Sequence, residues 1–482
     1  MKQNTIFVSA AALAGAGQAL TSEPTTYATT RAPLSTVEPS LSSIYAAQAT
    51  VQPSSPTSNV QGAAFDRIVQ IWLENTNFNA SAADPNMQWL TSQGILLTNY
   101  FAVTHPSEPN YAAVVGGDNF GMDNDDFNRF PANISTVVDL LDTKGISWGE
   151  YQEHLPYPGF EGFNFSNQAT YANDYVRKHD PLILYDSVAS NSSRVRQIKN
   201  FTSFTADLEA KTFPQWSFVT PNMTNDAHDT NITFAASWAR GFLEPLLNNT
   251  YFMNNTLVVL TFDENEEYPI PNRVYTILLG GAIDKSLHGT TDDLYYNHYS
   301  AISSVSVNWG LPSLGRWDCD ANVFALVANK TGYKNANISL DGLYFNESYP
   351  GPVSDSKYTA GWWPSPNTQA NCAAGKGVLP EIVKTWGNST GTYNYTNVYP
   401  YDQLAGVATG GTPVAGSMDS GSSSGSSSSS SGSTTTATAT GTSTSTGSSA
   451  SASSSKNAAA MGMQPDDVMK MLGAVGLVAA FL

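Results

Sequence analysis

The chain has 482 residues, only 13% of them charged, and its 40 acidic residues outnumber its 22 basic residues to give a formal net charge of −18. Residues 62–405 hold 18 of the basic and 35 of the acidic residues, so the acidity belongs to the central part. This charge argues against a partner nucleic acid, whose phosphates a basic surface must neutralise, and 41% hydrophobic residues exclude disorder of the whole chain.

The N-terminus has the pattern of a secretory signal. Lys2 precedes an apolar stretch over residues 6–16, and the small residues Gly17 and Ala19 follow, as at a cleavage site. We therefore predict a signal peptide over 1–20, with a buried first helix as the alternative. Residues 21–61 are rich in Ser, Thr, Pro and Ala, which predicts a flexible leader.

The central part alternates short apolar strands with amphipathic helices. The patterns predict strands at 67–73, 95–103, 146–151, 216–220, 256–262 and 273–279. They predict helices at 86–93, 109–115, 134–144, 204–211 and 234–247, the last interrupted or bent at Pro245. Strands that alternate with helices form largely parallel sheets covered on both faces. We therefore predict an α/β fold, a mostly parallel sheet sandwiched by helices, in one domain over 62–405.

The C-terminal part predicts a stalk and an anchor. Residues 420–455 consist only of Ser, Thr, Gly and Ala, so we expect an extended, O-glycosylated stalk over 406–457. Small residues, a polar spacer and the apolar tail 468–482 follow in the order of a GPI-attachment signal. We predict a GPI-attachment propeptide over 458–482, which makes the lipid anchor the chain's sole contact with the membrane. The alternative is a soluble secreted form.

Glycosylation sequons and cysteines agree with a secreted protein. The only cysteines are Cys319 and Cys372, which an oxidising compartment would allow to pair. Fourteen Asn-x-Ser/Thr sequons lie between the two terminal signals, at Asn79, Asn133, Asn164, Asn191, Asn200, Asn222, Asn231, Asn248, Asn254, Asn329, Asn337, Asn346, Asn388 and Asn394.

Carboxylate side chains come directly after two of the predicted strands. Glu74 and Asn75 come after the strand 67–73, and Asp263 and Glu264 come after the wholly apolar strand 256–262. Ligands of open α/β sheets bind at the carboxyl ends of the strands, and hard oxygen ligands hold divalent cations. These residues therefore predict a cation site. A simple turn and a solvated acidic loop are the alternatives.

Ser107 lies in a stiff turn between Pro106 and Pro109, before a predicted helix. The N-terminus of a helix attracts anions, and a hydroxyl beside a cation suits nucleophilic attack on phosphorus. A plain N-cap is the alternative. His228, after the strand 216–220, and His179 could protonate a leaving oxygen or stabilise phosphoryl oxygens. The alternative for each is a structural histidine with satisfied hydrogen bonds.

These motifs together resemble one family. The chain segments that carry the resemblance are IWLEN, THPSEPNYAAVVGGD, YVRKHDP, PNMTNDAHD, LTFDENE and YYNHYSAISSVSVNWGLP, within about residues 65–315. They resemble the phosphoesterase family of the alkaline-phosphatase-like superfamily, which contains fungal secreted acid phosphatases, bacterial acid phosphatases and non-haemolytic-type phospholipases C. The resemblance implies an alkaline-phosphatase-like fold for the domain.

The resemblance also implies roles for particular residues. It implies one divalent metal ion, of unknown identity, held by Glu74, Asn75, Ser107, Asp263 and Glu264. It implies that Ser107 is the nucleophile, that His228 is a candidate general acid, and that the phosphoryl group is contacted by Lys178, His179, His228 and Asn110. Asp226 and His228 could complete a second metal site, but the remaining ligands of two-metal members look incomplete here.

The resulting hypothesis is a secreted acid phosphatase, GPI-anchored at the cell surface or in the cell wall. It would hydrolyse small phosphate monoesters through a phosphoserine on Ser107. The first alternative is a phospholipase C or another phosphodiesterase with the same site, although the folded part is short for a phospholipase C. The second is a non-catalytic cell-wall protein, against which the intact site residues speak. Asn222 is a sequon inside the predicted site, so we expect it to be unglycosylated.

Overall fold

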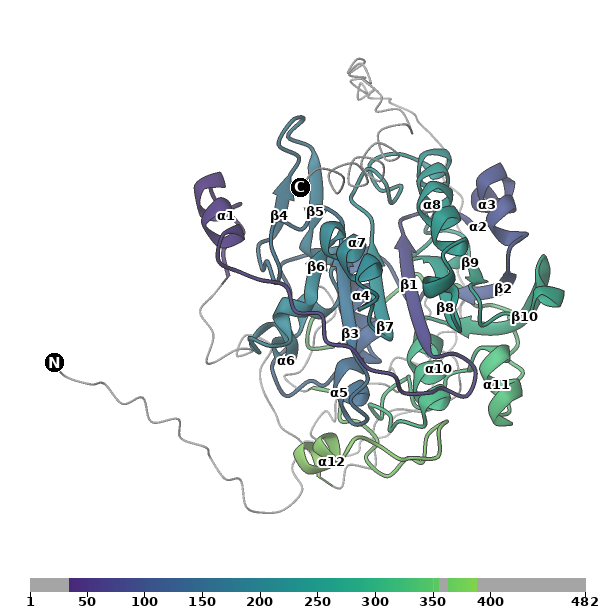
Figure 1. Cartoon of the computed structure of the whole chain (residues 1–482). Coiled ribbons are helices and arrows are strands. Elements are labelled where there is room, and N and C mark those ends of the chain that lie inside the picture. Colours follow the sequence, from purple (N-terminus) through teal and green to yellow (C-terminus); the bar gives the residue numbers. More distant parts are fainter. Residues whose placement is uncertain (1–33, 350, 355–362, 388–482) are drawn as a thin grey trace, which may run out of the picture. The chain divides into compact units, whose positions relative to one another are not determined.

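The computed structural model describes residues 34–349, 351–354 and 363–387, which belong to one compact unit (Figure 1). The predicted signal peptide, the whole of the predicted stalk and the predicted GPI-attachment propeptide lie outside the described residues, as do the sequons at Asn388 and Asn394. Within the described ranges, no helix is both long and apolar enough to cross a membrane.

An eight-stranded sheet forms the centre of the fold, in the order β10-β2-β9-β8-β1-β7-β3-β6. Every paired neighbour is parallel except β9, which runs antiparallel to both β2 and β8. The strands are β1 (Arg67–Leu73), β2 (Ile95–Phe101), β3 (Trp148–Gln152), β6 (Ile198–Asn200), β7 (Trp216–Thr220), β8 (Thr256–Phe262), β9 (Arg273–Leu279) and β10 (Thr290–Asn297). The prediction of an α/β fold with a mostly parallel sheet is confirmed.

Helices flank this sheet (Figure 1). One group of helices in mutual contact contains α2 (Phe78–Ala83), α3 (Pro85–Thr91), α8 (Ile232–Leu247) and α9 (Thr250–Met253). Another contains α4 (Ser107–Gly116), α5 (Val137–Asp142), α10 (Tyr299–Trp309) and α11 (Ala325–Thr331). The other α-helices of the described residues are α1 (Leu41–Gln48), α6 (Asp186–Ala189), α7 (Phe201–Glu209) and α12 (Pro380–Trp386).

The buried core explains why the central strands are so apolar. All seven residues of β8 and six of the seven in β1 are buried. Parallel strands covered on both faces bury residues of both orientations, so they read as continuous apolar runs instead of alternating patterns. These two strands therefore have the bounds that the sequence predicts.

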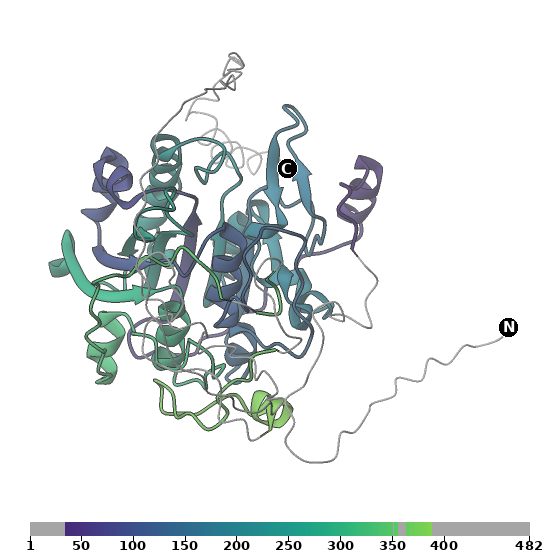
Figure 2. The ribbon, with the colours of Figure 1, turned by 180° about the vertical axis from the view of Figure 1, so that it is seen from behind.

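Other elements differ from the prediction. Helix α4 begins at Ser107, two residues before its predicted start, and α8 continues past Pro245 to Leu247. Strand β10 and helix α2 were not predicted, because β10 is polar and partly exposed and α2 is short. A two-stranded antiparallel hairpin, β4 (Asn164–Ser166) and β5 (Asn173–Val176), stands beside α1 in both views (Figure 1 and Figure 2).

Part of the stretch that we expected to be a flexible leader packs on the domain. We call residues 51–62 the N-terminal strap. Within it, the backbone N–H of Ser54 donates to the carbonyl of Arg196 (2.9 Å), and the hydroxyl of Ser58 donates to Gln215 Oε1 (2.6 Å). Trp309 Nε1 donates to the carbonyl of Val60 (3.2 Å). The strap thereby joins segments from different parts of the sequence.

A disulfide joins Cys319 to Cys372, which are 53 residues apart. It connects the segment after α10 to the segment before α12, and the expected pairing is confirmed.

Candidate active site

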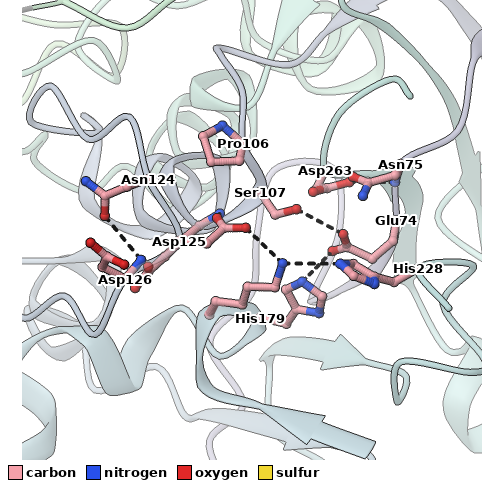
Figure 3. A network of polar contacts seen from close by, with 12 residues as sticks. Glu74, Asn75, Pro106, Ser107, Asn124, Asp125, Asp126, His179, His228 and Asp263 are labelled. Carbon is pink, nitrogen blue, oxygen red and sulfur yellow. Dashed lines mark hydrogen bonds and ion pairs between the residues drawn. The ribbon is translucent and has the colours of Figure 1, made fainter. Parts of the chain in front are cut away.

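The carboxyl ends of β1, β2, β7 and β8 lie at one edge of the sheet, because these four strands run in the same direction. Their following loops bring the predicted residues together at this edge. Figure 3 shows Glu74, Ser107, His179, His228 and Asp263 around a common point.

Ser107 is the first residue of α4, with Pro106 as its N-cap. Its hydroxyl donates a hydrogen bond to Glu74 Oε2 (3.1 Å), and only 1% of the residue is exposed. At the same helix end, the backbone N–H of Glu108 donates to Asp125 Oδ1 (2.9 Å). An anion therefore already lies at the N-terminus of α4, where free N–H groups and the helix dipole favour negative charge.

Glu74 connects the nucleophile to the imidazole of His179. Besides accepting from Ser107, its carboxylate accepts a hydrogen bond from the Tyr111 hydroxyl (2.5 Å) through Oε1, which lies 3.3 Å from His179 Nε2. The residue is fully buried. Burial, and then the neighbouring carboxylates Asp263 and Asp226, raise the pKa of Glu74 well above its usual range. Removing this negative charge from water is costly without a compensating cation.

The side chains around Glu74 fit a divalent cation. Glu74, His179 and His228 each offer a ligand atom, and these atoms lie within 4.8 Å of one another. Four buried polar atoms at this edge make no hydrogen bond to any described residue: Asn75 Oδ1, His179 Nε2, Asp226 Oδ2 and Asp263 Oδ2. Oxygen and imidazole nitrogen are ordinary ligands of divalent metals.

The electrostatics agree with that fit. Burial raises the pKa of Asp263 to about 6, because the carboxylate loses water without gaining a positive partner. Burial, and then Lys178, lower the pKa of His179, which keeps its ring neutral as a metal ligand requires. A cation at this point would relieve the repulsion among the acidic groups.

Lys178 and His228 form the solvent-facing side of the site. Lys178 Nζ donates to Asp125 Oδ2 (2.9 Å) and lies 3.2 Å from His228 Nε2, while His228 Nδ1 lies 2.9 Å from Asp229 Oδ1. The side chains of Lys178 and His228 are 17% and 25% exposed. Burial acts to lower the pKa of Lys178, but Asp125 and Glu74 outweigh it, so the pKa is raised and the ammonium stays charged.

Both the oxygen and the nitrogen of the Asn110 side-chain amide form hydrogen bonds within the protein. Its oxygen accepts from the backbone N–H groups of Val103 (3.0 Å) and Thr104 (3.3 Å). Its nitrogen donates to the carbonyls of Thr104 (2.9 Å) and Pro106 (3.2 Å) and to Glu264 Oε2 (3.2 Å). This geometry favours a positioning role for Asn110 over the predicted contact with a phosphoryl oxygen.

The structure therefore brings most of the predicted residues together. Glu74, Asn75, Ser107 and Asp263 lie in direct contact with one another, through Ser107 to Glu74 and through the Asn75 backbone N–H to Asp263 Oδ1 (3.0 Å). Glu264 is buried beside Asn110. His179, which we expected against the phosphoryl group, also lies among the candidate metal ligands.

Two residues of the site were missed. Tyr111 lies four residues after Ser107, so helical spacing places it on the same face of α4 and could have identified it. Asp125 lies in the irregular stretch between α4 and α5, where no periodic pattern or strand end marks it.

Comparison with known proteins identifies the family. Residues 58–312 match the Phosphoesterase family, and the chain belongs to it. The chain is 62% identical over 374 residues to an acid phosphatase of Aspergillus fumigatus, which covers 77% of this chain and 84% of that protein. It is 56% identical over 393 residues to an acid phosphatase of Aspergillus niger, which covers 80% of this chain and 94% of that protein.

A solved structure of a protein in the alkaline phosphatase superfamily from Vibrio parahaemolyticus is 13% identical, with a TM-score of 0.34, over 53% of this chain and 67% of that chain. The family resemblance that the motifs indicated is confirmed.

Proposed function

We propose that the protein is an acid phosphatase that hydrolyses phosphate monoesters through a phosphoserine on Ser107. The observation that carries the proposal is the Ser107 hydroxyl at the start of α4, hydrogen-bonded to Glu74 beside a cluster of side chains that fits a divalent cation. The names of the Aspergillus relatives support the acid phosphatase activity.

The chain's own residues account for the steps of the reaction. Ser107 Oγ attacks the phosphorus, and its proton passes to Glu74 Oε2, its hydrogen-bond acceptor. The bond from phosphorus to the alcohol oxygen breaks, and His228 protonates that oxygen. Water then attacks the phosphorus of the phosphoserine and gives a proton to His228. The bond from phosphorus to Ser107 Oγ breaks, Oγ takes back the proton held by Glu74, and inorganic phosphate is released. Phosphoryl transfer depends mainly on such positioning and on charge stabilisation.

The cation and the ammonium of Lys178 would together stabilise the negative charge of the phosphoryl group. Glu74, Asn75, Ser107, Asp263 and Glu264 would hold the cation, with His179 as a further ligand. Once bound, a divalent cation neutralises charge on the phosphoryl oxygens and lowers the pKa of the serine hydroxyl. Lys178 would turn its ammonium from Asp125 to a phosphoryl oxygen, because the two anions compete for the same donor.

Initial rates on phenyl phosphate and on the matching diester, diphenyl phosphate, at mildly acidic pH test the proposal. We expect a large preference for the monoester. A preference for the diester would instead favour the phosphodiesterase alternative, and hydrolysis of neither by folded protein would favour a non-catalytic one. Ser107→Ala should abolish turnover and leave the far-UV circular dichroism spectrum unchanged. Near-normal activity in this variant would contradict the role of Ser107 as the nucleophile.

We also propose that the protein is secreted and attached to the cell surface or cell wall by a GPI anchor. The N-terminal signal pattern, the stalk over 406–457 and the order of small residues, spacer and apolar tail support this. Phosphatidylinositol-specific phospholipase C should release the enzyme from intact cells. Retention after this treatment, with release by detergent alone, would contradict the lipid anchor.

A further inference from the structure

The loop that follows β8 places an aromatic ring beside the turn that carries the nucleophile. The ring of Tyr268 stacks on that of His105, with centroids 4.1 Å apart and planes at 28°. His105 lies two residues before Ser107 and is only 4% exposed, so it forms a buried support under the tyrosine. Tyr268 itself is 50% exposed.

Hydrogen bonds hold this loop against the nucleophile turn. His105 Nε2 lies 3.0 Å from the carbonyl of Asn265, and Asn272 Nδ2 donates to the carbonyl of Thr104 (2.9 Å). Asn77 Oδ1 accepts from the backbone N–H groups of Glu266 and Glu267, each at 3.2 Å. Because both ends of the loop are tied, the Tyr268 ring has a defined position relative to Ser107.

The hydroxyl of Tyr268 lies within the field of the site. Burial, and then the charges of Glu264 and Asp125, raise the pKa of Tyr268 to about 12. Asp263 and Lys178 also act on it. Asp125 and Lys178 belong to the solvent-facing side of the site, which places the tyrosine next to that side.

Half of the surface of Tyr268 stays exposed beside this turn. One part of the ring is used by the stack on His105, and the solvent-exposed part is free to contact a second planar group. Aromatic rings pair favourably in offset stacks, with about 0.5–1.5 kcal/mol beyond the area that they bury. The neighbouring Glu266 and Glu267 are exposed carboxylates and would repel a leaving group that carries further negative charge.

We propose that Tyr268, stacked on His105, forms a subsite for the leaving group and selects phosphate monoesters of uncharged aromatic alcohols. This inference rests on the proposed phosphatase activity and deepens it, because it concerns which alcohol the enzyme releases. Tyr268 is a specificity residue that contacts the substrate. It takes no part in the transfer of the phosphoryl group.

The test compares kcat/KM for phenyl phosphate and glycerol 2-phosphate in the wild-type holoenzyme and in Tyr268→Ala. We expect the variant to lose about 3- to 10-fold for phenyl phosphate, chiefly through KM, and to stay within about twofold for glycerol 2-phosphate. Tyr268→Phe keeps the ring and should retain the preference. Tyr45→Ala, which removes a tyrosine 60% exposed on α1, is the matched control and should change neither value.

Three results separate the explanations. An equal loss for both substrates would show that the ring only supports the nucleophile turn, and no loss would show that it contacts nothing; either would overturn the inference. Wild-type enzyme that hydrolyses neither ester would instead contradict the proposed function. Should Tyr268→Ala fail to fold, Tyr268→Leu keeps the apolar bulk and should show the same selective loss for phenyl phosphate.

A separate experiment tests whether Glu266 and Glu267 repel a negatively charged leaving group. The double variant Glu266→Gln/Glu267→Gln should raise kcat/KM for 4-carboxyphenyl phosphate by about 2- to 5-fold relative to phenyl phosphate, because surface charge pairs act with modest strength. An unchanged ratio would contradict the repulsion that we infer.

Discussion

The amide of Asn110 joins the nucleophile turn to the carboxylate of Glu264. It makes five hydrogen bonds, of which four hold the backbone between residues 103 and 106. Asn272, which donates to the carbonyl of Thr104, ties the same turn to the loop after β8. The position of Ser107 therefore depends on a residue that does not contact the reacting atoms.

Replacing Asn110 with Ala should lower both stability and turnover. We expect a loss of about 1–3 kcal/mol in the free energy of unfolding, because buried backbone groups lose their partners. A displaced Ser107 should lower kcat roughly 100-fold. Urea unfolding and steady-state kinetics check this, with Asn86→Ala on α3 as the control. A raised Ki for inorganic phosphate at unchanged stability would contradict positioning and favour a phosphoryl contact.

His154 contributes a pH-dependent interaction beside the hairpin β4–β5. Its Nδ1 lies 2.6 Å from Asp174 Oδ2, and this hydrogen bond, opposed by burial, raises the pKa of His154. A raised pKa in the folded state means that the contribution is fully present below the unfolded value of about 6.5 and is lost as pH rises through the folded pKa.

We therefore expect His154→Gln to lower the free energy of unfolding at pH 5 and to have less effect at pH 8. The effect should be small, because half of the His154 side chain is exposed and solvent screens the pair. Urea unfolding at the two pH values measures it, with His288→Gln as the control. A larger loss at pH 8 than at pH 5 would reverse the sign and contradict the interaction with Asp174.

At the scale of the elements, a buried ion pair connects β6, α7, β3 and the N-terminal strap. Lys199 Nζ lies 2.7 Å from Asp207 Oδ2, which also accepts from the hydroxyls of Tyr151 (2.7 Å) and Ser55 (3.0 Å). Lys199 is fully buried, and burial lowers its pKa in spite of Asp207. One carboxylate thus holds four elements together.

Asp207→Asn should destabilise the domain by about 3–5 kcal/mol, since it leaves the Lys199 ammonium buried without its counter-ion. Lys199→Met combined with Asp207→Asn should recover part of this loss. The exposed pair Arg240–Glu244 offers the comparison, and Glu244→Gln should cost no more than about 1 kcal/mol. Thermal unfolding of the wild type and the three variants measures these losses. Equal losses of stability in Asp207→Asn and Glu244→Gln would refute the prediction.

The elements also show how far the sequence predicts the fold. The strands β1, β7, β8 and β9 have their predicted bounds, because each is a run of residues buried on both faces. Strand β10 escapes the same reasoning, since four of its first five residues are charged or hydroxylated and it pairs with β2 at the edge of the sheet. Its pairing depends on a neighbour that lies far away in the sequence.

Much of the candidate site was predictable for a related reason. Glu74 and Asp263 directly follow strands that the sequence identifies, so their meeting at one edge follows from the direction of the strands. Asp125 reaches Lys178 from an irregular segment, and only the folded chain determines that contact. The same holds for Tyr268, whose position depends on hydrogen bonds between two loops.

At the scale of the whole molecule, a bound cation should matter for stability as well as for activity. Glu74, Asp226, Asp263 and Glu264 are buried together, and burial raises the pKa of each of these carboxyl groups. A ligand that binds only the folded state stabilises it by mass action. The net charge of −18 adds a general repulsion that a cation reduces.

Removal of divalent metal by EDTA and dialysis should abolish turnover and lower the thermal midpoint at neutral pH. Addition of Mg²⁺, Mn²⁺, Ca²⁺ or Zn²⁺ in turn should restore both with one preferred ion. The metal content of each sample provides the control. Full activity in protein shown to contain less than one-hundredth of an equivalent of metal would contradict the cation site.

The position of β1 has a consequence for how the chain is made. The first strand in the sequence is a central one, and its two neighbours are β7 and β8, which come far later. During synthesis the segment RIVQIWL therefore leaves the ribosome long before either of the strands that pair with it. Until residues 216–262 follow, this apolar segment lacks both of its partner strands, and a chain truncated before β7 should aggregate.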